Sequence, residues 1–292
     1  MAFPGPNGRI AFASKRTGRY EIHTMAPDGE DVRQLTDGPG DDVAPNWSPD
    51  GTGIVFTSTR DGSREIYVMA ADGNNQRRLT EHPAADHRPD WSADGAAIVF
   101  ASERETADER WHGGLGRRQL FWMDADGGNV TRLLRSEALD NAPHVSPDGT
   151  RIAFLRVQTN GHMAVYTIAA DGSDERKLTP DELNAAEPDW SPDGTRLVIQ
   201  NNTCPLPECE VPSDILVMGA DGHGLRRLTE DFGALSPRWS PDGTRIAFIR
   251  TLTIEPPFVF EIYTMGADGS DVRNLTNDLD VENSFPAWGP MR

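Results

Sequence analysis

Lysine is nearly absent from this 292-residue chain: only Lys15 and Lys177 occur, and 28 basic residues stand against 46 acidic ones. The formal net charge of −18 excludes a general nucleic-acid binder, which needs a cationic surface to neutralise phosphates. The same charge disfavours docking on anionic lipid. No apolar run approaches the roughly 20 residues that span a bilayer, so we expect no membrane insertion.

Cysteine is equally rare, with two residues five apart in a proline-rich segment, Cys204 and Cys209. No paired C-x-x-C motif is present, which argues against a structural zinc site. In an oxidising compartment we expect a small disulfide between them, and a pair of free thiols is the alternative. Helical patterns are also missing, because no segment keeps ten residues at helical spacing without glycine or proline.

A repeat runs through the whole chain instead. The tetrapeptide S-P-D-G, or a close variant, recurs with a period in the forties and fifties, and the equivalent glycines are Gly8, Gly51, Gly95, Gly149, Gly194 and Gly243. Each unit adds a P-x-W segment, an I-A-F run, an E-I-Y-x-M segment, an A-D-G turn and a final L-T. Short segments rich in β-branched and aromatic residues, bounded by Asp-Gly, predict four strands per unit.

Six such units predict an all-β fold, a six-bladed β-propeller of four-stranded antiparallel blades. The chain enters with the second strand of a blade, Arg9–Ala13, and ends with an unmatched first strand, Phe285–Trp288. We expect this C-terminal strand to complete the N-terminal blade and close the ring, since an open blade would leave unpaired backbone. Residues 1–292 then form a single propeller domain, expected to be a monomer.

Most repeated residues have a structural explanation. The ring at the end of each P-x-W segment is expected to pack between blades; these residues are Trp47, Trp91, Trp190, Trp239 and Trp288, with Val145 in the remaining unit. The aspartates of the P-D-G and A-D-G turns are expected to bond local backbone. We also expect Arg16, Arg60 and Arg250 to pair with Glu21, Glu65 and Glu261 of the same hairpins.

The repeat D-x-x-P-x-W-S-P-D-G-x-x-I-A-F, followed by E-I-Y-x-M-x-A-D-G and L-T, resembles that of TolB-like six-bladed propellers over Gly8 to Trp288. The resemblance implies a secreted or periplasmic protein-interaction scaffold. Ala2-Phe3-Pro4-Gly5 is also similar to the mature start of such chains, and a cytoplasmic location is the alternative. The name-giving member binds a lipoprotein partner at the mouth of the propeller channel. No G-x-S-x-G elbow is present, so we expect no peptidase.

The loops between the second and third strands carry the irregular sequence, on the same face as the loops that join blades. Binding residues favour variable loops on a rigid scaffold. On this face Trp111 and Phe258 are candidate aromatic anchors for a protein or peptide partner.

Three acidic residues, Asp42, Asp86 and Asp140, stand three positions before the proline of the first strand, and Asn283 takes the equivalent place in the closing strand. The first strands line the channel, so these groups are expected to ring its mouth. They could bind Ca²⁺ through oxygen ligands or contact a cationic partner group. Alternatively, each aspartate pairs with a nearby arginine.

Histidines suggest a rival function, because five of the seven fall on this face. A metal held by His87, His112 and His144 would make the protein a carbohydrate lyase or hydrolase. Their spacing is not a ligand motif, and solvated loop histidines explain it equally well. We therefore expect a non-enzymatic binding scaffold that requires no cofactor, and Ca²⁺ at the acidic ring is the one ion that the sequence suggests for it.

Overall fold

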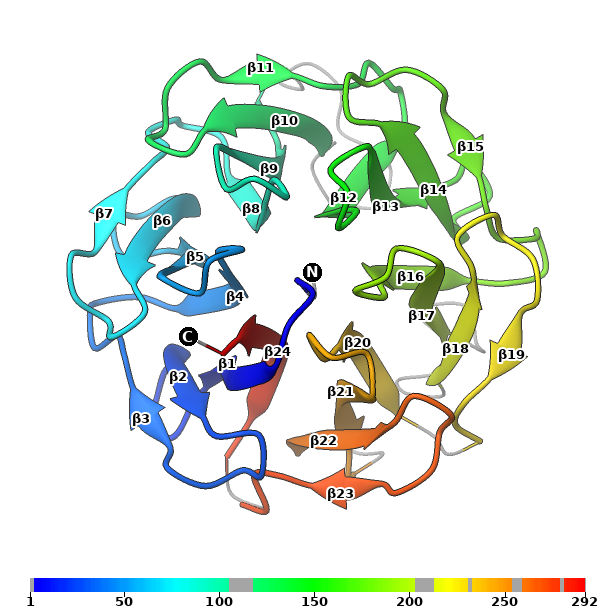
Figure 1. Cartoon of the computed structure of the whole chain (residues 1–292). Helices are drawn as coiled ribbons and strands as arrows, with labels where there is room; N and C mark the ends of the chain where they lie inside the picture. Colours follow the sequence, from blue (N-terminus) through cyan, green and yellow to red (C-terminus); the bar gives the residue numbers. More distant parts are fainter. Residues whose placement is uncertain are drawn as a thin grey trace.

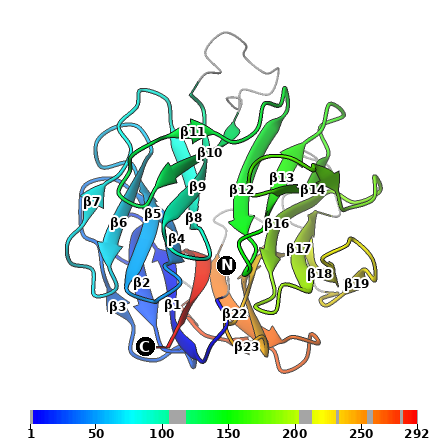
Figure 2. The same ribbon diagram turned by 45° about the horizontal axis from the view of Figure 1, so that its top comes forward.

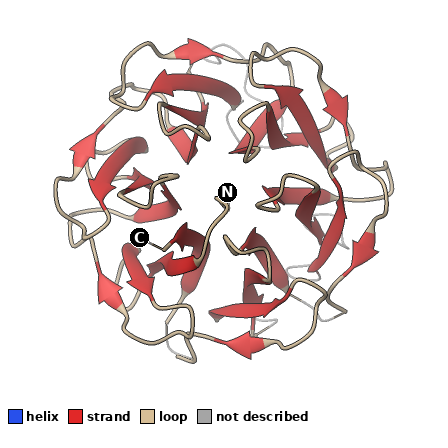
Figure 3. Ribbon diagram, viewed as in Figure 1, coloured by secondary structure: helices blue, strands red, loops and turns tan. Residues whose placement is uncertain are grey.

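The computed structural model describes residues 3–104, 118–202, 213–230, 233–253, 259–278 and 281–291. Six four-stranded antiparallel sheets stand around a common axis like blades, which confirms the predicted propeller (Figure 1). Figure 3 shows strands and loops only. Within the described residues no helix has the length and apolar character needed to cross a membrane.

Each blade runs from an innermost strand at the channel to a two-residue strand at the rim. The innermost strands are β24 (Asn283–Pro290), β4 (Asp42–Trp47), β8 (Asp86–Trp91), β12 (Leu139–Val145), β16 (Ala185–Trp190) and β20 (Ala234–Trp239). The second strands are β1 (Asn7–Ser14), β5 (Gly53–Ser58), β9 (Ala97–Ser102), β13 (Arg151–Val157), β17 (Arg196–Asn202) and β21 (Arg245–Thr251).

The outer half of each blade repeats in the same way. The third strands are β2 (Glu21–Met25), β6 (Glu65–Ala70), β10 (Gln119–Asp124), β14 (Met163–Ala169), β18 (Ser213–Gly219) and β22 (Phe260–Gly266). The rim strands are β3 (Arg33–Gln34), β7 (Arg77–Arg78), β11 (Thr131–Arg132), β15 (Arg176–Lys177), β19 (Arg226–Arg227) and β23 (Arg273–Asn274). We number the blades one to six from the N-terminus, so that β24 belongs to blade one.

The C-terminal strand closes the ring as the sequence predicts. β24 pairs with β1 in blade one, with Ile10 opposite Trp288 and Ala13 opposite Ser284. The sheet order is therefore β24-β1-β2-β3; the C-terminal end lies beside this blade, whereas the N-terminal end reaches the centre of the ring (Figure 1). Closure leaves every innermost strand paired on its outer side, so the channel wall has no gap between blades one and six.

The S-P-D-G turns hold their shape through side chains. Ser48 Oγ donates to Asp50 Oδ1 at 2.6 Å and accepts from the Gly53 amide at 2.8 Å, while Asp50 Oδ1 accepts from the Thr52 amide at 2.9 Å. The serine-to-aspartate bond recurs at Ser92, Ser146, Ser191 and Ser240. These aspartates are turn formers, as predicted, so much of the acidic excess belongs to the architecture.

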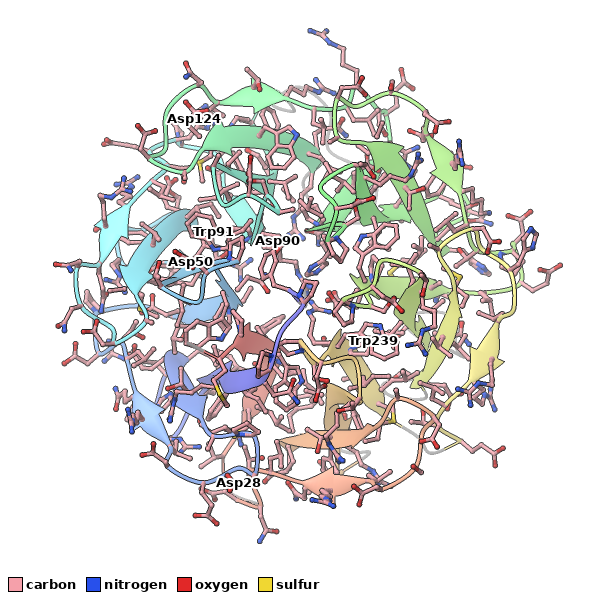
Figure 4. All side chains as sticks on the ribbon, in the orientation of Figure 1. Asp28, Asp50, Asp90, Trp91, Asp124 and Trp239 are labelled. Carbon is pink, nitrogen blue, oxygen red and sulfur yellow. The ribbon has the colours of Figure 1, made fainter. Side chains whose placement is uncertain are left out.

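The repeated indole rings pack between blades, which confirms their predicted role. All five are buried, and Val145 fills the same position in blade four. Trp190 Nε1 donates to the His144 carbonyl of the preceding blade at 3.0 Å, and Trp91 Nε1 donates to the Asn46 carbonyl at 3.3 Å. Figure 4 labels two of these rings, Trp91 and Trp239, on the inner part of their blades.

Candidate functional site: the channel mouth

Every innermost strand breaks its regular geometry at the residue before its proline. Its φ is positive in all six blades: Ala44 52°, Arg88 49°, Ala142 48°, Glu187 50°, Ser236 49° and Phe285 53°. The register against the second strand shifts at the same place, which marks a β-bulge. A left-handed backbone at non-glycine residues is uncommon, and its sixfold recurrence turns one extra side chain per blade toward the axis.

The predicted acidic ring lies at the start of these strands, and arginine neutralises each member. Arg60 Nη2 meets Asp42 Oδ2 at 2.7 Å, Arg104 Nη2 meets Asp86 Oδ2 at 2.5 Å, and Arg156 Nε meets Asp140 Oδ1 at 2.6 Å. All three carboxylates are buried.

Burial raises the pKa of Asp86 and of Asp140, although their arginines oppose that rise. Asn283 is buried as well, and its Nδ2 donates to the Val281 carbonyl at 3.3 Å. The pairing alternative therefore describes these aspartates better than an open set of metal ligands.

Two of the expected hairpin ion pairs are wrong. Arg16 Nε donates to Ser14 Oγ at 3.0 Å, and Glu21 accepts from Thr36 Oγ1 at 2.6 Å and not from Arg16. Arg60 reaches Asp42 on the innermost strand and not Glu65. Glu65 instead accepts from Thr80 Oγ1 at 2.6 Å and from Arg78 Nη2 at 2.9 Å. The Thr80 hydroxyl and Arg78 thus supply the hydrogen bonds of the buried Glu65 carboxylate. Arg60 pairs instead with Asp42 on the channel side of the blade.

A charge network crosses the channel one step deeper. Arg88 of β8 pairs with Glu187 of β16, two blades away, and Arg238 Nη2 of β20 meets the other Glu187 oxygen at 3.3 Å. The Arg88 guanidinium also lies 5.2 Å from the Phe285 ring centroid. Burial alone would raise the pKa of Glu187, but the charges of Arg88 and Arg238 hold it below the usual range. Glu187 is therefore ionised between two cations.

The residues after the proline form a third, still deeper layer that joins neighbouring blades. Asp90 Oδ2 accepts from the Val145 amide at 3.0 Å, and Asp189 Oδ2 accepts from the Trp239 amide at 2.7 Å. His144 lies between them, with Nδ1 3.7 Å from Asp90 Oδ2 and 3.8 Å from Asp189 Oδ1. Burial lowers the pKa of His144 far below its usual value, so its imidazole is neutral.

The centre of the ring is therefore filled at this depth. The cavity bounded by Arg88, His144, Arg238 and Phe285 has a free volume of about 10 Å³, room for about one water molecule. The Arg88, Glu187 and Arg238 side chains constrict the channel at this depth, below the mouth on the face of the blade-joining loops. Figure 2 shows this ring from a tilted view.

Positive charge gathers at the mouth of the channel between blades two and three. Glu103 Oε1 receives His87 Nε2 at 3.1 Å and Arg118 Nε at 3.2 Å. Burial lowers the pKa of Arg118, and the nearby charges of Arg88 and Arg64 lower it further, against the opposing effect of Glu103. Arg64 lies at the same mouth, since its carbonyl accepts from the Asp86 amide at 2.8 Å, and Arg88 follows on β8, in a protein whose net charge is −18.

The predicted histidine cluster is not assembled by the described residues. His87 contacts Glu103, whereas His144 lies in the deeper layer beside Asp90 and Asp189. In the described part of the chain, no group of three or more His, Cys, Asp or Glu is arranged to hold a metal ion. His112, the anchors Trp111 and Phe258, and the pair Cys204 and Cys209 lie outside the described residues, and their roles stay predictions.

Sequence reasoning missed Arg88, Glu187 and Arg238. The signal that could have found them is variation inside the repeat. The position before the proline reads Ala, Arg, Ala, Glu, Ser and Phe around the ring, and the position after it reads Asn, Asp, His, Asp, Arg and Ala, while the proline between them is the same in all six units. A variable position in a repeated inner strand is a candidate for a partner-facing residue.

The fold and this site define a six-bladed β-propeller with arginines gathered at its channel mouth. The chain belongs to the family described as the TolB beta propeller domain, which matches residues 2–111, 59–158 and 113–292.

Solved structures agree on the fold. TolB from Acinetobacter baumannii aligns with a TM-score of 0.79 at 20% identity, over 97% of this chain and 67% of that one. A putative TolB from Agrobacterium tumefaciens aligns with a TM-score of 0.70 at 20% identity, over 98% and 99%. An oligogalacturonate lyase in complex with manganese aligns with a TM-score of 0.62 at 17% identity, over 93% and 77%. No curated protein matches the chain.

Proposed function

We propose that this chain is a non-enzymatic scaffold that binds an acidic segment of a protein or peptide partner at the channel mouth. The observation that carries this proposal is the cluster of Arg64, Arg88 and Arg118 in an otherwise strongly acidic protein. Charge complementarity at an interface steers the encounter and selects the partner. Membership of the TolB propeller family supports a binding role and a secreted or periplasmic location.

The arginine cluster favours an acidic partner, whereas the sequence suggested a cationic partner group. Asp42, Asp86 and Asp140 each already hold an arginine, so they offer little to an incoming cation. Arg64 is exposed, and no described carboxylate forms an ion pair with it. Arg88 and Arg118 pair with Glu187 and Glu103, so Arg64 is the guanidinium of this cluster that has no ion-pair partner among the described carboxylates. Guanidiniums bind carboxylates well.

A labelled oligoglutamate peptide tests the proposal by fluorescence anisotropy. The double variant Arg64→Glu/Arg118→Glu should weaken binding by about tenfold, corresponding to about 1.4 kcal/mol. The matched control replaces two exposed arginines far from the mouth, Arg77→Glu and Arg273→Glu, and so changes the net charge equally. Binding that is unaffected by the mouth variant, or reduced equally by the control, would reject the proposal.

A further inference from the structure

On the opposite face of the disc, a cluster of two arginines around one aspartate recurs in three blades. We call this cluster the clasp. In blade one, Arg9 at the start of β1 and Arg33 on β3 both contact the carboxylate of Asp31, at 2.8 Å and 2.5 Å. Blade four places Arg151 and Arg176 on Asp174 at 2.8 Å and 2.7 Å, and blade six places Arg245 and Arg273 on Asp271 at 2.7 Å and 2.9 Å. Two guanidiniums thus hold one carboxylate.

The first arginine of the clasp also donates hydrogen bonds to a threonine and to a backbone carbonyl. Arg151 Nη2 donates to Thr167 Oγ1 at 3.2 Å and to the Asp174 carbonyl at 2.8 Å. Arg245 Nη2 donates to Thr264 Oγ1 at 3.0 Å and to the Asp271 carbonyl at 2.9 Å. A threonine on the third strand and an aspartate in the following turn are therefore parts of the same device.

Blades two and three lack both the first arginine and the aspartate of the clasp, although blade two keeps Arg77 at the second arginine position. Gly53 and Ala97 replace the first arginine, and Asn75 and Asn129 replace the aspartate. In these five blades the first arginine and the carboxylate are present together or absent together. This correlation identifies the aspartate as the partner of the arginines and not merely a turn former.

Blade five alone keeps both arginines and loses the carboxylate. Arg196 and Arg226 take the clasp positions, but Gly224 stands where the aspartate would be and Val217 replaces the threonine. Among the described residues, no carboxylate forms an ion pair with either arginine. The Arg196 guanidinium lies instead 4.6 Å from the Trp239 ring centroid, and Arg226 Nη1 donates to the Asp268 carbonyl at 3.2 Å.

A pocket of about 430 Å³ is found where the carboxylate is missing. Arg196, Gly224 and Arg226 line it, beside β18 and β19 (Figure 1). The Asp221 carboxylate also lines the pocket, and its Oδ1 accepts from the His223 amide at 3.0 Å. The backbone is already shaped for the clasp: φ at Gly224 is 68°, close to the 51° of Asp31 and Asp174. A Cβ added at Gly224 would meet no atom within 4 Å.

We propose that this blade-five pocket binds a carboxylate ligand, whose carboxylate takes the place that an aspartate side chain occupies in blades one, four and six. Arg196 and Arg226 would donate charge-assisted hydrogen bonds to its two oxygens. The exposed character of the three intact clasps indicates modest strength, with a dissociation constant in the millimolar range for a simple carboxylate. The pocket lies on the face opposite the channel mouth, so the two sites can be tested separately.

The test is an NMR titration of the ¹⁵N-labelled protein with succinate at constant ionic strength. Saturable shifts of the amides around Arg196 and His223 to Arg226 are expected. The variant Gly224→Asp supplies an internal carboxylate and should abolish them. The matched control Asn129→Asp adds the same charge at the equivalent turn of blade three, where Ala97 and Thr131 replace both arginines, and should leave succinate binding unchanged.

A second variant, Arg196→Gln, should also abolish the shifts while the spectrum elsewhere stays native. A peptide with a free carboxyl terminus and its amidated form distinguish a free small carboxylate from a chain terminus as the natural source, because a terminus ligand should bind more tightly than succinate only when its carboxylate is free. The proposal is overturned if neither succinate nor the free-terminus peptide gives saturable shifts, or if shifts persist in Gly224→Asp.

Discussion

Arg88 on β8 and Glu187 on β16 form an ion pair across the central channel, although 99 residues separate them in the chain. Both stand directly before a proline, and both have the left-handed backbone that turns their side chains inward. The pair joins blades three and five without passing through blade four. It constricts the channel below the mouth and fixes the guanidinium of Arg88 at the base of the proposed binding surface.

Removing the carboxylate of this pair should destabilise the ring. In Glu187→Gln the charges of Arg88 and Arg238 remain beside each other in a buried site. Removing one partner of a buried ion pair lowers the free energy of unfolding by about 3–5 kcal/mol. Chemical denaturation at neutral pH measures this loss, and an unchanged midpoint would show that the cross-channel pair contributes nothing net.

Glu187 also predicts how the free energy of unfolding falls at acidic pH. Its pKa in the folded protein is lowered, so its contribution is present above the unfolded pKa of about 4.3 and is lost as the pH falls through the folded value. The wild type should therefore lose stability on acidification more steeply than Glu187→Gln. Parallel curves for the two proteins would contradict this assignment.

Asp90 predicts a pH dependence of the opposite sign. Burial raises its pKa to about 6, so the folded state holds a proton that the unfolded state releases near pH 4. Stability should fall as the pH rises from about 4 to 6, and Asp90→Asn should remove that fall and gain about 2–3 kcal/mol at pH 7. At a pH below both values the two proteins should be equally stable, which provides the control.

Asp86 should behave as an arginine partner. Asp86→Ala leaves the Arg104 guanidinium, 13% exposed, without its carboxylate and should cost about 3 kcal/mol. A Ca²⁺ ion bound to the native state would raise the melting temperature in proportion to the logarithm of its concentration. We expect no such rise, and a calcium-dependent melting temperature in the wild type that is lost in Asp86→Ala would restore the calcium site.

Ring closure depends on a glycine beside a neighbouring indole. A Cβ at Gly289 would lie 2.7 Å from the Trp47 ring, between blades one and two. Gly289→Ala should therefore lower the free energy of unfolding by about 1–3 kcal/mol through overpacking. Gly38→Ala, where a Cβ meets nothing nearer than 3.5 Å, is the matched control and should leave the melting temperature nearly unchanged.

The repeat made the architecture predictable because each local signal agrees with the global fold. The S-P-D-G serines and aspartates bond their own turns, the tryptophans fill the space between blades, and Phe285–Trp288 completes blade one. All of these are short-range consequences of one unit and its neighbour.

The site was less predictable because it depends on which blades face each other. The sequence pointed to the right strands at Asp42, Asp86 and Asp140, but it could not decide between a cation site and pairing with arginines on or just after the second strands. The meeting of Arg88 with Glu187 requires the ring itself. The vacant clasp of blade five, by contrast, is written in the repeat, since Gly224 replaces an aspartate while both arginines stay.

The central claim, that the channel mouth binds an acidic segment, is tested most directly by mapping where such a segment contacts the labelled protein. NMR shifts induced by an oligoglutamate peptide should concentrate on Arg64, His87, Arg88 and Arg118 and should vanish in Arg64→Glu/Arg118→Glu. Shifts confined to the blade-five pocket on the opposite face, or spread evenly around the ring, would contradict it.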